Sequence, residues 1–155
     1  MDIDEWHPYQ SRPISWPLLT GIYVAFWSMS KQEVICIGNA FSYYLAFIGV
    51  IGVLFGYKKE KFLIALRYTI GWAVSYFPFY LVPRTMYLYH YHIPLMIGAC
   101  AFGAFIDLFI PREFRGAVTV LACFLCFVGF ILWSPYVYGY VPWDKSVTIW
   151  NENWA

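Results

Sequence analysis

The sequence predicts an all-α membrane protein with four antiparallel transmembrane helices. Of its 155 residues, 61% are hydrophobic and only 12% are charged, whereas an average soluble chain carries about 25% charged residues. Four apolar runs, at residues 40–57, 62–82, 93–111 and 117–138, have about the 17–25 residues that cross a hydrocarbon core. Short connectors follow the first and third runs, so neighbouring helices are expected to be antiparallel.

Residues 1–38 are predicted to form an amino-terminal tail with an interfacial segment. The apolar stretch 14–27 is too short to span and is interrupted by Pro17 and Gly21, so it favours an interfacial or re-entrant segment. Residues 33–37 are β-prone. The acidic start of the chain matches neither a signal peptide nor a mitochondrial presequence.

Residues 39–140 are predicted to be the transmembrane domain, and 141–155 a polar, Trp-rich tail. Each span should be helical because an unpaired peptide group in lipid costs several kcal/mol. The tight connectors are rich in cations, which are Lys58, Lys59, Lys61, Arg112 and Arg115. This density indicates the cytoplasmic or matrix side. Both termini then lie on the other side, which is lumenal in the endoplasmic reticulum.

Two charged residues fall inside the expected spans. Arg67 and Asp107 lie at a similar depth on the side of the basic connectors, at a helical rise of about 1.5 Å per residue. We therefore expect an intramembrane ion pair that fixes the register of two helices. Contact with a substrate or lipid is the alternative, since intramembrane charges are often functional.

Small residues recur at helical spacing in the first and third runs. Gly49, Gly52 and Gly56 share one side of the first run, and Ala99 and Gly103 do likewise in the third. Such faces let helix backbones approach closely. They are therefore predicted to be helix-packing positions.

The tail carries three tryptophans, Trp143, Trp150 and Trp154. Tryptophan is enriched among the residues that anchor protein interfaces. We therefore expect these side chains to contact neighbouring subunits.

The segment between the second and third spans concentrates polar and aromatic side chains at one interface. These are Arg84, Tyr87, Tyr89, His90, Tyr91 and His92. A cation beside hydroxyl donors could hold a lipid head group. A belt of interfacial aromatics with two solvated histidines is the alternative.

Several other site classes are not expected. A net charge of +1 gives no electrostatic footprint for nucleic acid. The four cysteines, Cys36, Cys100, Cys123 and Cys126, lie in apolar runs without disulfide or zinc spacing. No catalytic constellation, metal-ligand set or cofactor motif is apparent. We therefore predict no catalytic residue, metal or cofactor for this chain.

Four stretches of the sequence resemble one known family. The run RTMYLYHY at 84–91, followed by Pro94 and Leu95, is similar to the FLYHYLPAL signature of protein O-mannosyltransferases, with the proline shifted by one position. The stretches SWPL at 15–18, CIGN at 36–39 and SPYVYG at 134–139 fall in the same order as in that family. The resemblance is to its carboxyl-terminal four-helix membrane domain. It implies an endoplasmic reticulum membrane protein with lumenal termini, and it carries over no catalytic residue, because the family's catalytic acidic pair lies in its amino-terminal half.

The leading functional hypothesis is a non-catalytic scaffold subunit, with the initial Met taken to favour a stand-alone chain. It would hold a phospholipid or polyprenyl lipid and other membrane subunits. The first alternative is the carboxyl-terminal part of a split or truncated dolichyl-phosphate-mannose-dependent mannosyltransferase, with catalysis on another chain. The second is an accessory subunit of an organellar respiratory-type complex, in the mitochondrial inner membrane.

Overall fold

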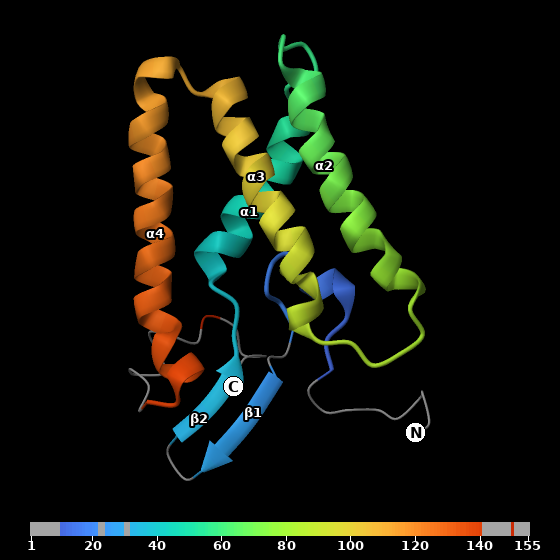
Figure 1. The fold of residues 1–155 in the computed structure, drawn as a ribbon, viewed down its shortest axis with the longest axis vertical. Coiled ribbons are helices and arrows are strands. Elements are labelled where there is room, and N and C mark those ends of the chain that lie inside the picture. The colour runs from blue at the N-terminus through green and yellow to red at the C-terminus, as the bar shows by residue number, and fades with distance from the viewer. Residues whose placement is uncertain (1–9, 22–23, 30–31, 141–149, 151–155) are drawn as a thin grey trace.

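The computed structural model describes residues 10–21, 24–29, 32–140 and 150 of the chain. Four α-helices make up most of this part, and the bounds are α1 Ala40–Leu54, α2 Phe62–Tyr76, α3 His92–Phe109 and α4 Arg112–Tyr138. Successive helices run in opposite directions (Figure 1). The basic connectors lie at one end of the bundle, and α1 begins and α4 ends at the other. The expected four-helix fold is therefore confirmed.

A small β-hairpin precedes the helices, which the predicted all-α class did not include. Strand β1, Val24–Met29, pairs antiparallel with β2, Gln32–Cys36. The β-prone piece expected at 33–37 lies largely in β2. The interfacial segment expected at 14–27 instead enters a 3-10 turn, η1 at Pro13–Ser15, and then strand β1.

The helix ends differ from the expected spans for local reasons. Helix α2 stops at Tyr76 and continues as a 3-10 turn, η2 at Phe77–Leu81, because Pro78 has no N–H to donate. Helix α4 begins at Arg112 rather than at residue 117. Its two arginines therefore lie in its first turns, and Ile110 and Pro111 alone connect it to α3.

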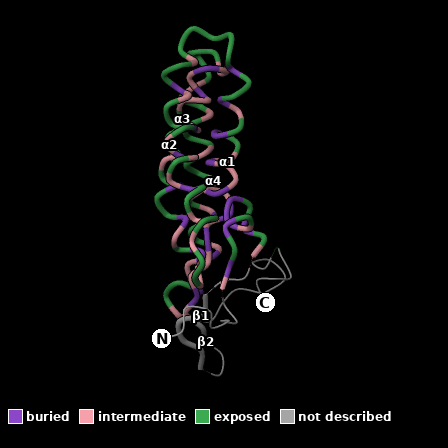
Figure 2. The backbone as a smooth tube through the Cα atoms, turned by 90° about the vertical axis from the view of Figure 1, so that its right-hand side faces the viewer, coloured by how far each residue is buried: buried purple, intermediate pink, exposed green. Residues whose placement is uncertain are grey.

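Two described helical segments are long and apolar enough to cross a membrane. They are Leu88–Phe109, which combines the 3-10 turn η3 at Leu88–Tyr91 with α3, and Arg112–Tyr138. Helix α1 is apolar but shorter. Helix α4 is mostly exposed along its length (Figure 2) and is buried mainly near its carboxyl end, at Gly129, Trp133, Pro135 and Tyr136.

The closest helix contact joins α1 to α3. A Cβ atom on Gly49 would lie 2.2 Å from the backbone nitrogen of Phe102, and one on Gly52 would lie 2.5 Å from the ring of Phe105. A Cβ on Gly56 would approach a methyl group of Leu108 at 3.0 Å. Gly49 and Gly52 of α1 therefore lie against α3, and Gly56, just after α1, lies close to the carboxyl end of α3.

The two small residues of α3 that were expected to pack against another helix, Ala99 and Gly103, are not at its close contact with α1. Ala99 is exposed, and a Cβ on Gly103 would meet nothing within 4 Å. Gly98 is the close-packed position instead, since its Cβ would lie 3.0 Å from Cβ of Ala46. The spacing of small residues could not say which side of α3 faces α1.

A polar bridge ties α4 to the start of α1. The Asn39 side chain caps α1 by accepting from the backbone N–H of Ser42 at 3.4 Å. Its Nδ2 donates to the carbonyl of Cys126 at 2.8 Å. All four cysteines are free thiols, with Cys100 and Cys123 exposed and Cys36 and Cys126 partly buried. Burial raises the pKa of the Cys36 thiol, which lies outside the helices.

Candidate functional site

The segment between α2 and α3 contains η2, residues 82–87 and then the turn η3, at the end of the bundle opposite the basic connectors. The Tyr87 N–H donates to Nδ1 of His90 at 3.2 Å. The same ring nitrogen lies 3.0 Å from the Tyr87 carbonyl oxygen. His90 therefore holds the turn together rather than projecting freely from it.

An aromatic stack forms on this turn. The ring centroids of Tyr89 and His90 are 4.6 Å apart, and those of Tyr87 and Tyr89 are 5.5 Å apart. Tyr89 is about half exposed, and Arg84 and His92 are exposed. Of the six side chains predicted here, these three are the most exposed, Tyr87 and His90 are partly exposed, and Tyr91 is buried.

Tyr91 belongs to the core instead of this surface. It is completely buried, and its phenol accepts a hydrogen bond of 2.9 Å from Nε1 of Trp72. Its ring also packs on those of Tyr43 and Tyr76, with centroids 5.6 and 5.5 Å away. Tyr91 therefore anchors the start of α3 to α1 and α2.

The amino-terminal segment packs against the turn η3. This contact was not expected from the sequence. The Ser11 N–H donates to the Met86 carbonyl at 2.9 Å. Trp16 is completely buried, and its ring stacks on His90 with centroids 6.3 Å apart. The only available signal was the family-like stretch SWPL, which includes Trp16.

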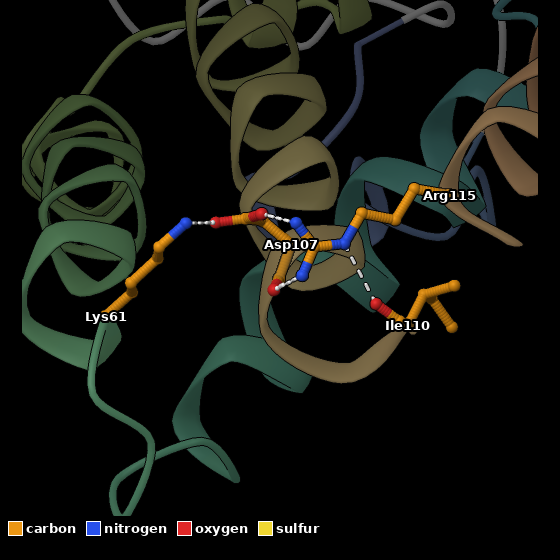
Figure 3. Close-up of polar contacts among 4 residues, drawn as sticks. All are labelled: Lys61, Asp107, Ile110 and Arg115. Atoms are coloured by element: carbon orange, nitrogen blue, oxygen red, sulfur yellow. Dashed lines mark hydrogen bonds and ion pairs between the residues drawn. The ribbon is translucent and has the colours of Figure 1, made fainter. Parts of the chain in front are cut away.

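A charged cluster lies at the opposite end of the bundle (Figure 3). Asp107 on α3 pairs with Nζ of Lys61 at 2.8 Å and with Arg115 on α4. Arg115 also donates to the carbonyl of Asp107 at 2.7 Å and to that of Ile110 at 2.9 Å. This cluster joins the amino end of α2 to the α3–α4 corner.

The expected pair of Arg67 with Asp107 is not among the ion pairs of the described residues. Arg67 lies on an exposed side of α2. At about 100° per residue, it points roughly 120° away from Lys61 around the helix axis. The expectation rested on similar depth in the membrane, and depth does not fix the direction in which a side chain points.

The tail contributes one described aromatic residue. The ring of Trp150 lies 4.9 Å from that of Trp133 and 5.5 Å from that of Phe41, centroid to centroid. Trp143 and Trp154 lie outside the described residues. Within the described part, no three His, Cys, Asp or Glu residues gather as metal ligands.

Comparison with known proteins gives a consistent result. Residues 2–154 match the family model described as the C-terminal four TMM region of protein-O-mannosyltransferase. The chain is 31% identical to Saccharomyces cerevisiae dolichyl-phosphate-mannose--protein mannosyltransferase 1, over 97% of this chain and 21% of that protein. It is 32% identical to S. cerevisiae dolichyl-phosphate-mannose--protein mannosyltransferase 5, over 98% and 24%. The chain therefore spans less than a quarter of the length of these relatives.

A solved structure has the same fold. The S. cerevisiae protein O-mannosyltransferase Pmt1-Pmt2 complex bound to the sugar donor matches 97% of this chain and 24% of that chain, with a TM-score of 0.77 and 27% identity. The chain belongs to the protein O-mannosyltransferase family and corresponds to its carboxyl-terminal four-helix membrane region.

Proposed function

We propose that this chain forms the carboxyl-terminal membrane part of a dolichyl-phosphate-mannose-dependent protein O-mannosyltransferase. The observation that carries the proposal is the family match over residues 2–154, together with the shared fold. This reading was the first alternative from the sequence, and the comparisons favour it over the scaffold hypothesis. Residues 39–140 are the membrane unit, flanked by 1–38 and 141–155.

The proposed location is the endoplasmic reticulum membrane. The basic connectors face the cytoplasm, because cations concentrate in short cytoplasmic loops. The segment between α2 and α3, which bears Arg84, then lies at the lumenal face, together with both termini. The family match gives no support to the mitochondrial alternative.

The proposed role of the lumenal surface is to hold the phosphate of a polyprenyl lipid. The exposed Arg84 supplies a cation, and exposed Tyr89 and His92 supply hydrogen-bonding groups near it in sequence. Bonds from a guanidinium to phosphate are among the stronger hydrogen bonds in proteins. The chemistry of mannosyl transfer would come from another part of the enzyme or from another chain.

Membrane proteins of the same family are the proposed partners. The structural relative is described as a complex of Pmt1 and Pmt2. Trp150, about half exposed at the edge of the bundle, is one candidate contact. The surface around Trp150 would also contact other subunits if the chain is a scaffold subunit rather than part of an enzyme.

The test is gentle extraction of native membranes, a blue-native gel, and mass spectrometry of the proteins that migrate with this chain. The same complex is assayed for transfer of radiolabelled mannose from dolichyl phosphate mannose to a Ser/Thr-rich acceptor peptide. The proposal is supported if the chain migrates with further mannosyltransferase sequence and the complex has transfer activity. Comigration with an unrelated complex that lacks transfer activity overturns it and leaves the scaffold hypothesis.

A further inference from the structure

Arg67 lies at the centre of the outward face of α2. The side chains of α2 that are buried in the bundle are Ala65, Thr69, Trp72 and Tyr76. At about 100° per residue, Arg67 is roughly 140–180° away from each of them around the helix axis, and it is exposed. Exposed apolar side chains surround it, and these are Leu63, Ile64, Ile70 and Val74. A positive charge therefore lies in the middle of an apolar surface.

This charge lies at a depth that lipid chains would occupy. Helix α2 and η2 together cover residues 62–81, which is about the 17–25 residues that cross a hydrocarbon core. Arg67 lies about 9 Å beyond Lys61 along the helix axis. Because an ion in hydrocarbon is costly, charged side chains of membrane helices almost always face other protein or water and pair there. Lipid chains alone are therefore a poor covering for the outward face of α2.

The described part of the chain holds no counter-charge for Arg67. Both ion pairs among these residues are made by Asp107 with other cations (Figure 3). Glu60 lies in the α1–α2 connector and Glu113 in the first turn of α4, and neither pairs with Arg67. A carboxylate or phosphate from another molecule, or from another part of the protein, is therefore needed to neutralise the guanidinium.

Two small residues beside Arg67 favour a helix over a lipid as the covering group. Gly71 and Ser75 follow Arg67 at intervals of four residues, so the three lie in one row along α2. Packing within the bundle does not require a glycine at 71, since a Cβ there would meet only a methyl group of Ile97, at an ordinary 3.5 Å. The Ser75 hydroxyl is satisfied by the Trp72 carbonyl at 2.9 Å. Small residues let the backbone of another helix approach closely, whereas a lipid chain adapts to a surface of any shape.

We propose that the outward face of α2 binds a transmembrane helix that carries an aspartate or glutamate at the depth of Arg67. The carboxylate pairs with the guanidinium through charge-assisted hydrogen bonds, and Gly71 and Ser75 let the two helices approach closely. Helices α2 and α4 lie on opposite sides of the α1–α3 pair (Figure 1), so this face is separate from the exposed sides of α4. The inference goes beyond the proposed function, because it holds for a transferase and for a scaffold complex alike.

Matched variants separate the contributions of the charge and of the glycine. Arg67→Leu removes the charge, and Arg67→Lys keeps it. Arg112→Leu is the control, because Arg112 is also an exposed arginine but lies at the start of α4. Gly71→Leu blocks a close approach, and Gly116→Leu is its control, because a Cβ on Gly116 would meet nothing within 4 Å. Thermal unfolding of each variant in the same detergent checks that the four helices still fold.

The experiment places a photo-crosslinking phenylalanine analogue at Val74 of the full chain in its native membranes. Val74 is exposed on the same side of α2 as Arg67, about two turns further along. The same analogue at Phe124, which is exposed on α4, is the positional control. After irradiation and gentle extraction, mass spectrometry identifies the crosslinked peptides.

We expect the analogue at Val74 to crosslink to a transmembrane peptide that contains an aspartate or glutamate, and the analogue at Phe124 not to reach that peptide. The yield should fall about tenfold in Arg67→Leu, which corresponds to about 1.4 kcal/mol, and by a similar factor in Gly71→Leu. Arg67→Lys, Arg112→Leu and Gly116→Leu should keep most of the yield. Arg67→Glu should abolish the crosslink, and replacement of the identified carboxylate by arginine in the same cells should restore it.

Several results would overturn the proposal. An unchanged yield in Arg67→Leu, or a crosslinked helix without a carboxylate, would remove the ion pair, as would a failure of the exchanged charges to restore the crosslink. Crosslinks to lipid alone, with less copurifying phospholipid in Arg67→Leu, would assign the guanidinium to a lipid phosphate, which a long side chain reaches by turning back towards the membrane surface. Polyprenyl phosphate bound at the Arg84 segment should be retained in Arg67→Leu, so the two proposals fail separately.

Discussion

The hydroxyl of Tyr76 donates a hydrogen bond of 2.7 Å to the backbone carbonyl of Pro13, which lies 63 residues earlier in the chain. Both residues are buried. This bond fastens the amino-terminal segment to the end of α2, from which the chain continues to the segment that bears Arg84. The candidate lumenal surface is therefore built from two separate parts of the sequence, and its shape depends on their union.

Removal of this bond should weaken the fold. Tyr76→Phe leaves the Pro13 carbonyl buried without its donor, which costs about 1–3 kcal/mol. The free energy of unfolding in detergent, followed by tryptophan fluorescence, is the measurement. Tyr80→Phe is the matched control, because the Tyr80 hydroxyl lies 3.0 Å from that of Tyr76 but Tyr80 is half exposed. Equal losses in both variants would contradict a special role for the Pro13 bond.

The close approach of α1 and α3 predicts that Gly49→Ala is destabilising. The added methyl group would lie 2.2 Å from a backbone nitrogen of Phe102, so the two helices must move apart. Overpacking of this kind costs about 1–3 kcal/mol. Gly116→Ala, which has open space around its Cβ, should be neutral or slightly stabilising because alanine favours helix. Thermal unfolding of both proteins in the same detergent compares them, and a neutral Gly49→Ala would argue against this packing.

The charged cluster predicts energetic coupling between Asp107 and Arg115. In a double-mutant cycle with Asp107→Asn and Arg115→Gln, we expect a coupling of about 1 kcal/mol, because both side chains are only partly buried. A cycle that combines Arg67→Leu with Asp107→Asn should be additive. Coupling in the Arg67 cycle, and none in the Arg115 cycle, would restore the ion pair expected from the sequence.

The proposed lipid role of the lumenal surface predicts a loss of bound lipid in Arg84→Ala. A hydrogen bond to a charged group contributes about 1.5–3 kcal/mol, so the content of copurifying polyprenyl phosphate should fall about tenfold or more. Mass spectrometry of lipids extracted from the purified complex measures this. Arg67→Ala is the control, since Arg67 is also exposed but lies in the first half of α2, whereas the Arg84 segment follows the end of that helix. Unchanged lipid content in Arg84→Ala would support the alternative of an aromatic belt.

The sequence by itself determined the class of the protein. Four apolar runs of membrane length in a chain poor in charge require helices, because lipid offers no partners for the backbone. The glycine spacing at Gly49, Gly52 and Gly56 correctly indicated a close helix contact. The run at 84–91 and the other three stretches were enough to indicate the family, which residues 2–154 then confirmed.

Only the tertiary structure decided which side chains meet. Arg67 and Asp107 were expected to pair because residue counting placed them at similar depth, but Asp107 pairs with Lys61 at the start of α2 and with Arg115 at the α3–α4 corner. Tyr91 was expected at the membrane interface but is fully buried, together with Trp16 of the amino-terminal segment, whose ring lies 6.3 Å from that of Tyr91, centroid to centroid. Hydrophobic patterning records how deep a residue lies in a membrane. The direction in which it points is set by the helix it packs against, and that helix is distant in the sequence.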